Sequence, residues 1–103
     1  MPLKKFLLSS ALLVVLPGMS YACSAPEPPS FPDPKTAELP EMVKTQKALK
    51  KYLAASKDYL GCVRNDLKHD AHVAAMKQTA DKYNEVTLLY KARVRTERAV
   101  ASN

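Results

Sequence analysis

Apolar residues, with a few polar exceptions, recur at alternating steps of four and three along most of the chain after Pro40. The first run comprises Met42, Gln46, Leu49, Leu53, Ser56, Leu60, Val63 and Leu67, and the second comprises Val73, Met76, Ala80, Tyr83, Thr87, Tyr90 and Val94. This spacing is typical of a helix that packs lengthwise against another helix. The sequence therefore predicts an all-α fold, an antiparallel two-helix hairpin resembling a coiled coil, over residues 41–98.

The two runs also predict how the helices are aligned. Folding the second run back on the first gives pairs whose residue numbers add to 136, as 63 and 73 do: Val63–Val73, Leu60–Met76, Ser56–Ala80, Leu53–Tyr83, Leu49–Thr87, Gln46–Tyr90 and Met42–Val94. We expect the first helix to begin between Glu38 and Glu41, because Pro40 suits a first turn. The turn should lie at residues 68–70, with Asp70 as the N-cap of the second helix.

The positions that flank this seam differ on the two sides of the hairpin. One side is apolar and should be covered by another segment; it carries Ala48, Tyr52, Ala55, Tyr59, Cys62, Ala75, Thr79, Val86 and Leu89. The opposite side carries cations and no acid at the equivalent heptad positions: Lys50, Lys57, Arg64, Lys77, Lys91 and Arg98. We refer to these six residues as the basic side. It is a candidate anion-binding surface, and an ordinary solvated outer face is the alternative.

Residues 1–22 have the pattern of a secretory signal peptide. Lys4 and Lys5 precede a short apolar run, and small residues stand before a predicted cleavage site at Cys23. The run is too short to span a bilayer; a retained membrane anchor is the alternative. Cleavage would lower the formal net charge from +6 to +4, because only Lys4 and Lys5 are lost. We therefore expect an exported protein, periplasmic or secreted, with no stable transmembrane anchor after processing.

Residues 23–40 contain six prolines, Pro26, Pro28, Pro29, Pro32, Pro34 and Pro40. This composition excludes a helix or a central strand and predicts an extended, polyproline-like segment. An even pair of cysteines, Cys23 and Cys62, remains after export, and in an oxidising compartment such a pair usually forms a disulfide. The bond would lay the segment along the apolar side, where its prolines and Phe31 would cover Tyr52 and Tyr59.

Two alternatives to the disulfide remain open, namely lipidation of Cys23 and free or intermolecular thiols. Ser20, three places before Cys23, is a poor match to the aliphatic residue of a lipoprotein signal. At the other end of the chain, residues 99–103 are expected to form a frayed tail.

Other residues with potential chemistry have simpler structural interpretations. His69, Asp70 and His72 could contribute to a metal site, but a strong site needs three or four ligands, so a solvent-exposed turn is the favoured interpretation. Tyrosines 52, 59, 83 and 90 could line an aromatic groove, although tyrosines at this spacing usually serve packing. The sequence contains no glycine-rich phosphate loop and no evident nucleophile–base arrangement. It therefore predicts a non-enzymatic protein without a cofactor.

The order of these features resembles a family of short, exported, uncharacterised bacterial helical proteins. The resemblance covers most of residues 23–103 and is carried by Cys23, Pro26, Pro29, Pro32, Asp33, Met42, Gln46, Tyr59, Cys62, His69 and Asn84. It implies export, a disulfide and a helical hairpin, and it brings no activity. We expect an interaction protein whose partner is an unknown envelope protein. The alternative is a module that binds polyanions or anionic membranes through the basic side, and self-association is a further arrangement.

Overall fold

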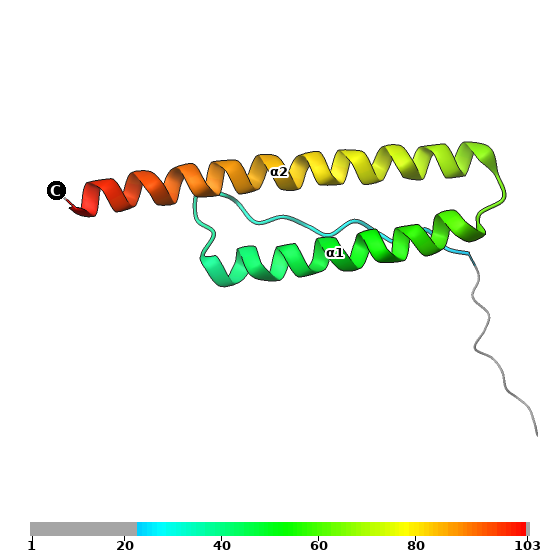
Figure 1. The fold of residues 1–103 in the computed structure, drawn as a ribbon, viewed down its shortest axis with the longest axis horizontal. Helices are drawn as coiled ribbons and strands as arrows, with labels where there is room; N and C mark the ends of the chain where they lie inside the picture. The colour runs from blue at the N-terminus through cyan, green and yellow to red at the C-terminus, as the bar shows by residue number, and fades with distance from the viewer. Residues whose placement is uncertain (1–22, 103) are drawn as a thin grey trace, which may run out of the picture.

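The structure, a computed structural model, describes residues 23–102, and the predicted signal peptide lies outside this range. Two helices, α1 (Leu39–Cys62) and α2 (Asp66–Ser102), lie side by side and antiparallel (Figure 1). Residues 23–38 run as an extended segment along them, and the described residues form no strand. The predicted all-α hairpin is therefore confirmed. Neither helix has an apolar stretch long enough to cross a bilayer.

The connection between the helices comes five residues earlier in the chain than predicted, at residues 63–65. The α1 helix ends at Cys62, and the N–H of Val63 donates to the carbonyl of Tyr59 at 2.8 Å. The α2 helix begins at Asp66, and the N–H of Lys68 donates to the side-chain oxygen of Asn65 at 2.9 Å. Asn65 is thus the N-cap, a role for which asparagine is among the best residues. The predicted turn at residues 68–70, with Asp70 as the cap, is wrong.

The position of the turn decides the register of the hairpin. Because the connection is centred on residue 64, residues that face each other have numbers adding to 128, as 56 and 72 do. The side chains of Ser56 and His72 meet at 2.8 Å, and Met42 and Val86 belong to one buried cluster. The predicted sum of 136 is therefore wrong. The predicted register places α2 eight residues, or roughly two helical turns, away from its observed position along α1.

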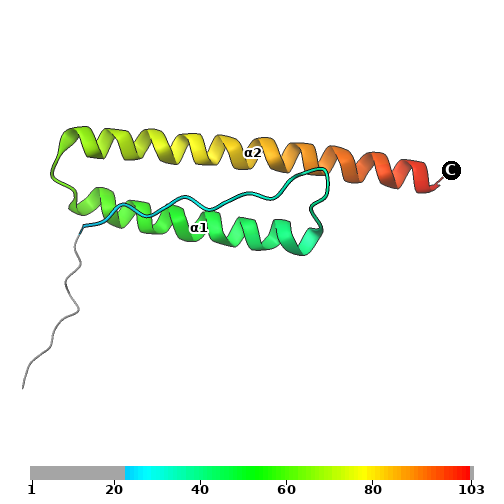
Figure 2. The same ribbon diagram turned by 180° about the vertical axis from the view of Figure 1, so that it is seen from behind.

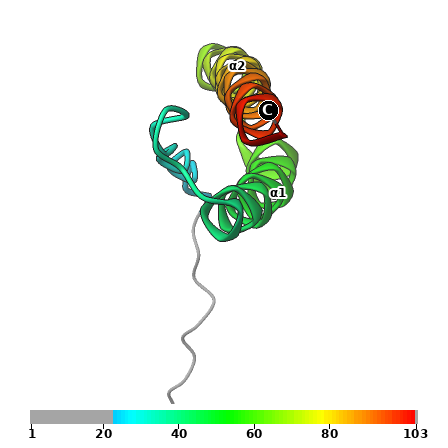
Figure 3. The ribbon, with the colours of Figure 1, turned by 90° about the vertical axis from the view of Figure 1, so that its left-hand side faces the viewer.

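The buried face of α1 is rotated away from the predicted seam and toward residues 23–38. Its buried residues are Met42, Thr45, Leu49, Tyr52, Ser56 and Tyr59, whereas Gln46 is exposed and Leu53 and Leu60 are half-buried. On α2 the buried residues are His72, Thr79 and Val86. Seen end-on, each helix contacts two neighbours, the other helix and the extended segment (Figure 3). The centre of its buried face therefore lies between the two neighbours and not opposite one of them.

The segment of residues 23–38 forms the third layer of the molecule (Figure 2). The Cys23–Cys62 disulfide, with a Cα–Cα distance of 5.9 Å, fixes its first residue to the end of α1. Farther along, Phe31 packs against the cluster of Ala37, Met42 and Val86. The sequence predicted that the ring of Phe31 would cover Tyr52 and Tyr59. In the structure it packs at this other cluster instead.

Candidate functional site

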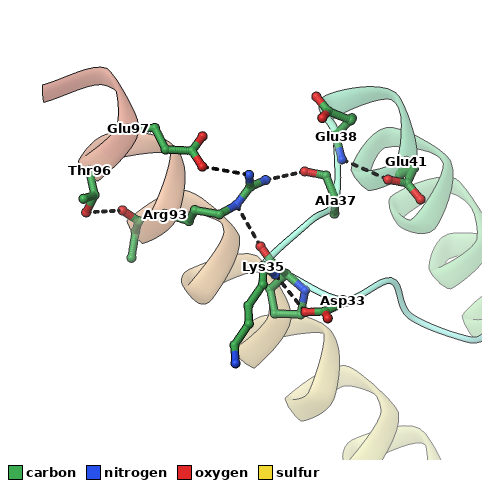
Figure 4. A network of polar contacts seen from close by, with 10 residues as sticks. Asp33, Lys35, Ala37, Glu38, Glu41, Arg93, Thr96 and Glu97 are labelled. Carbon is green, nitrogen blue, oxygen red and sulfur yellow. Dashed lines mark hydrogen bonds and ion pairs between the residues drawn. The ribbon is translucent and has the colours of Figure 1, made fainter. Parts of the chain in front are cut away.

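Arg93 attaches the far end of the extended segment to α2 (Figure 4). Its Nε donates to the carbonyl of Pro34 at 3.0 Å, its Nη2 donates to the carbonyl of Ala37, and its Nη1 donates to Glu97 at 3.1 Å. The guanidinium also lies over the ring of Tyr90, 5.5 Å from its centroid. The extended segment is thus attached to the helices at both ends, by Arg93 at residues 34–37 and by the disulfide at Cys23.

Sequence reasoning missed this role of Arg93, because the pattern of the chain does not show which backbone carbonyls lie near its side chain. A detectable signal existed nearby, since Asp33 precedes a proline and can form a turn by accepting from the backbone. In the structure the Asp33 side chain accepts from the N–H of Lys35 at 2.8 Å. In this turn the carbonyls of Pro34 and Ala37 both accept hydrogen bonds from the guanidinium of Arg93.

His72 is buried at the centre of a polar and aromatic cluster between the helices. Its Nε2 lies 2.8 Å from the hydroxyl oxygen of Ser56, and its ring centroid lies 4.9 Å from that of Tyr59 and 5.9 Å from that of Tyr52. The favoured interpretation of His72 as part of an exposed turn is therefore wrong. The reason is again the register, since starting α2 at Asp66 turns His72 toward α1.

The same cluster has the residue types of a nucleophile and its base, but not the access that catalysis requires. Ser56 has 0% exposure, so a substrate cannot reach its hydroxyl. The metal interpretation also loses its ligand set, because His69 pairs with Asp70 on the surface at 3.3 Å while His72 points inward. Among residues 23–102, no three histidine, cysteine or acidic side chains gather as metal ligands would.

The four tyrosines lie in packing positions. Tyr52 and Tyr59 are buried, and Tyr83 and Tyr90 are half-buried. The ring of Phe31 lies 6.4 Å from that of Tyr83. The spacing of the tyrosines is therefore explained by packing inside the fold and does not require an aromatic binding groove.

All six residues of the basic side are exposed. Lys77 forms a surface ion pair with Asp81 at 2.9 Å, while the other five have no ion-pair partner among the described residues. Hollows on the opposite side of α1, between α1 and the extended segment, are lined by Ala48 and Ala55. Helical geometry turns Lys50 and Lys57 away from that segment, because each follows an alanine by two residues, roughly 200° around the axis.

Cations are also concentrated in one part of α2. Residues 66–87 carry three lysines and four acids, namely Lys68, Lys77, Lys82, Asp66, Asp70, Asp81 and Glu85. Residues 88–102 carry four cations and one acid, namely Lys91, Arg93, Arg95, Arg98 and Glu97. A hollow of about 240 Å³ in this second part is lined by Tyr90, Lys91, Val94, Arg95 and Arg98.

Comparison with known proteins gives no match to a family model, to a curated protein or to a solved structure. The function of this chain is therefore inferred from its own geometry.

Proposed function

We propose that this protein is a small, non-enzymatic interaction protein that acts outside the cytosol, in the periplasm or as a secreted protein, by binding another envelope component. The observation that carries the proposal is the Cys23–Cys62 disulfide, which holds the extended segment as a structural layer. Disulfides persist in oxidising compartments and are rare in the cytosol. The signal-peptide pattern of residues 1–22 supports the same location.

Absence of catalysis is part of this proposal. The pair that most resembles a nucleophile and base, Ser56 and His72, lies in the interior and is explained by helix packing. Polar groups are used instead to hold the three layers together, as the contacts of Arg93 illustrate. An elongated surface held rigid in this way suits binding to a partner.

Export and binding can be tested separately. For export, the protein is expressed with its own leader, and the envelope fraction is analysed for an N-terminus at Cys23 and for free thiols. A processed, thiol-free protein is expected, and cytosolic protein with two free thiols would refute the location. For binding, photo-crosslinkers replace Lys57 on the basic side and Lys51, which lines a hollow beside the extended segment. A discrete crosslink to one envelope component, formed reproducibly from one of the two positions and not from the other, would support a specific binding surface. Absence of crosslinks from both would refute it.

A second candidate function is binding of polyanions or anionic membranes, and the exposure of the whole basic side favours it. Binding that rests on charge weakens steeply as salt rises, whereas apolar pairing does not. The variant Lys50→Glu/Lys57→Glu/Lys77→Glu should bind anionic vesicles and envelope extracts less well than the unmodified protein at low salt. Equal binding by both proteins would leave only the interaction protein.

A further inference from the structure

We infer that the C-terminal overhang of α2, residues 91–102, docks on the surface of a membrane containing anionic lipids. The contact would be made by Lys91, Arg95 and Arg98, together with the neighbouring apolar residues Leu88, Tyr90 and Val94. This inference rests on the second candidate function above and locates its site. It replaces a surface distributed along both helices with one compact patch.

The overhang arises from the unequal lengths of the helices. The register places Leu39, the first residue of α1, opposite residue 89 of α2, since 39 and 89 add to 128. The rest of α2, up to Ser102, continues past the start of α1 (Figure 1). The extended segment reaches this region only at its turn, where Arg93 binds the carbonyls of Pro34 and Ala37. Beyond that point α2 has no described neighbour to cover it.

Three cations of the overhang lie on one face of the helix and are available to a ligand. Lys91, Arg95 and Arg98 follow the spacing i, i+4, i+7, which lines them up over roughly 10 Å of helix. All three are exposed, and none has a carboxylate within ion-pair distance among residues 23–102. Arg93, on another face, is the one already occupied by internal contacts.

Apolar side chains accompany these cations. Tyr90 and Val94 contribute to the same hollow of about 240 Å³. Leu88, three residues before Lys91 and seven before Arg95, shares their face and is 67% exposed. Cations interspersed with exposed aliphatic groups on a helix are typical of a surface that lies in the headgroup region of a bilayer.

The arrangement favours a lipid surface over a nucleic acid. Single-stranded nucleic acids bind by stacking bases on aromatic rings, but the ring of Tyr90 is half-buried and lies beneath Arg93. Three cations within roughly 10 Å can neutralise only a few phosphates of a polynucleotide, which gives weak binding. A bilayer presents its phosphates in a plane, so the remaining basic side can add longer-range attraction.

The test is co-sedimentation of the oxidised, exported protein with phosphatidylcholine vesicles that contain or lack phosphatidylglycerol, at low and at physiological salt. The overhang variant is Lys91→Glu/Arg95→Glu/Arg98→Glu. Its matched control is Lys44→Glu/Lys51→Glu/Lys68→Glu, which changes the net charge equally at exposed residues that line hollows on the other side. We expect the overhang variant to lose at least about tenfold in partitioning, and the control to lose much less. Circular dichroism checks that both variants remain helical.

The remaining outcomes separate this inference from the functions on which it rests. Equal losses in the overhang variant and in Lys50→Glu/Lys57→Glu/Lys77→Glu would overturn the compact site and keep anion binding. Binding to heparin or single-stranded DNA without binding to the vesicles would overturn the membrane assignment alone. No binding of the unmodified protein to any of these anions would overturn both the site and the second candidate function, leaving the interaction protein intact.

Discussion

Ser56 and His72 lie on different helices, and Oγ of the first and Nε2 of the second are 2.8 Å apart in the interior of the hairpin. Both residues are buried, with 0% and 7% exposure. A buried polar group requires a hydrogen-bond partner to offset the loss of water. Sliding one helix along the other would separate the pair, so this contact helps to select one register.

Replacing Ser56 with alanine should lower the free energy of unfolding by about 1–3 kcal/mol, because it leaves His72 buried without its partner. Urea denaturation measures the change. Tyr52→Phe is the matched control in the same cluster. The Tyr52 hydroxyl is buried and has no hydrogen-bond partner among the described residues, so its removal should be nearly neutral or stabilising. A larger loss in Tyr52→Phe than in Ser56→Ala would contradict this account.

The register can be tested with double-mutant cycles between helices. Met42 and Val86 belong to one buried cluster, so Met42→Ala and Val86→Ala should be coupled by at least about 0.5 kcal/mol in unfolding free energy. Met42→Ala and Val94→Ala, the pair expected from the sequence pattern, should be additive. Coupling in the second cycle and additivity in the first would restore the register in which the numbers add to 136.

The disulfide should account for a large part of the stability of this small protein. It closes a loop with a sequence separation of 39, which corresponds to about 3–4 kcal/mol in the chain-entropy treatment. The free energy of unfolding of Cys23→Ser/Cys62→Ser, measured by urea denaturation, should therefore be lower by that amount. Its tyrosine fluorescence should also become more accessible to quenchers, because Tyr59 lies beside Cys23, whose Sγ is 3.4 Å from the tyrosine carbonyl oxygen. Reductant should destabilise the natural protein and leave the double variant unchanged.

Arg93→Met should cost at least about 1.5 kcal/mol in unfolding free energy, because it leaves the carbonyls of Pro34 and Ala37 without a charged donor. Arg95→Met, two residues farther along α2 and without a hydrogen-bond or ion-pair partner among residues 23–102, should change stability by no more than about 0.5 kcal/mol. Hydrogen exchange provides a local readout, since the amides of Thr36 and Ala37, which donate to the carbonyl of Asp33, should exchange faster only in Arg93→Met. Equal effects of the two substitutions would mean that Arg93 does not hold the segment.

The local pattern of the chain was sufficient for the main elements. Steps of four and three after Pro40 predict two helices, because side chains at this spacing share one helical face. The proline content of residues 23–40 excludes a third helix, and the pair of cysteines places the segment against the hairpin. The apolar flank correctly indicates a covered side at Tyr52, Tyr59 and Val86, which are buried, but not at Leu89, which is 52% exposed. These inferences depend on residues close together in the sequence, except for the cysteine pair, whose members are 39 residues apart and were matched only because the chain has no others.

The register, the centre of the buried face and the role of Arg93 depended instead on contacts between distant residues. Apolar stripes that repeat every seven residues match each other in alignments seven residues apart, so the pattern alone leaves the register open. The observed sum of 128 also uses another stripe on α2, because the buried His72, Thr79 and Val86 each lie one residue before a predicted seam position. The end of α1 at Cys62 and the cap at Asn65 made that choice. Burial of His72 followed from it. Arg93 acquired its partners only because the extended segment, fixed by the disulfide, brings two backbone carbonyls within its reach.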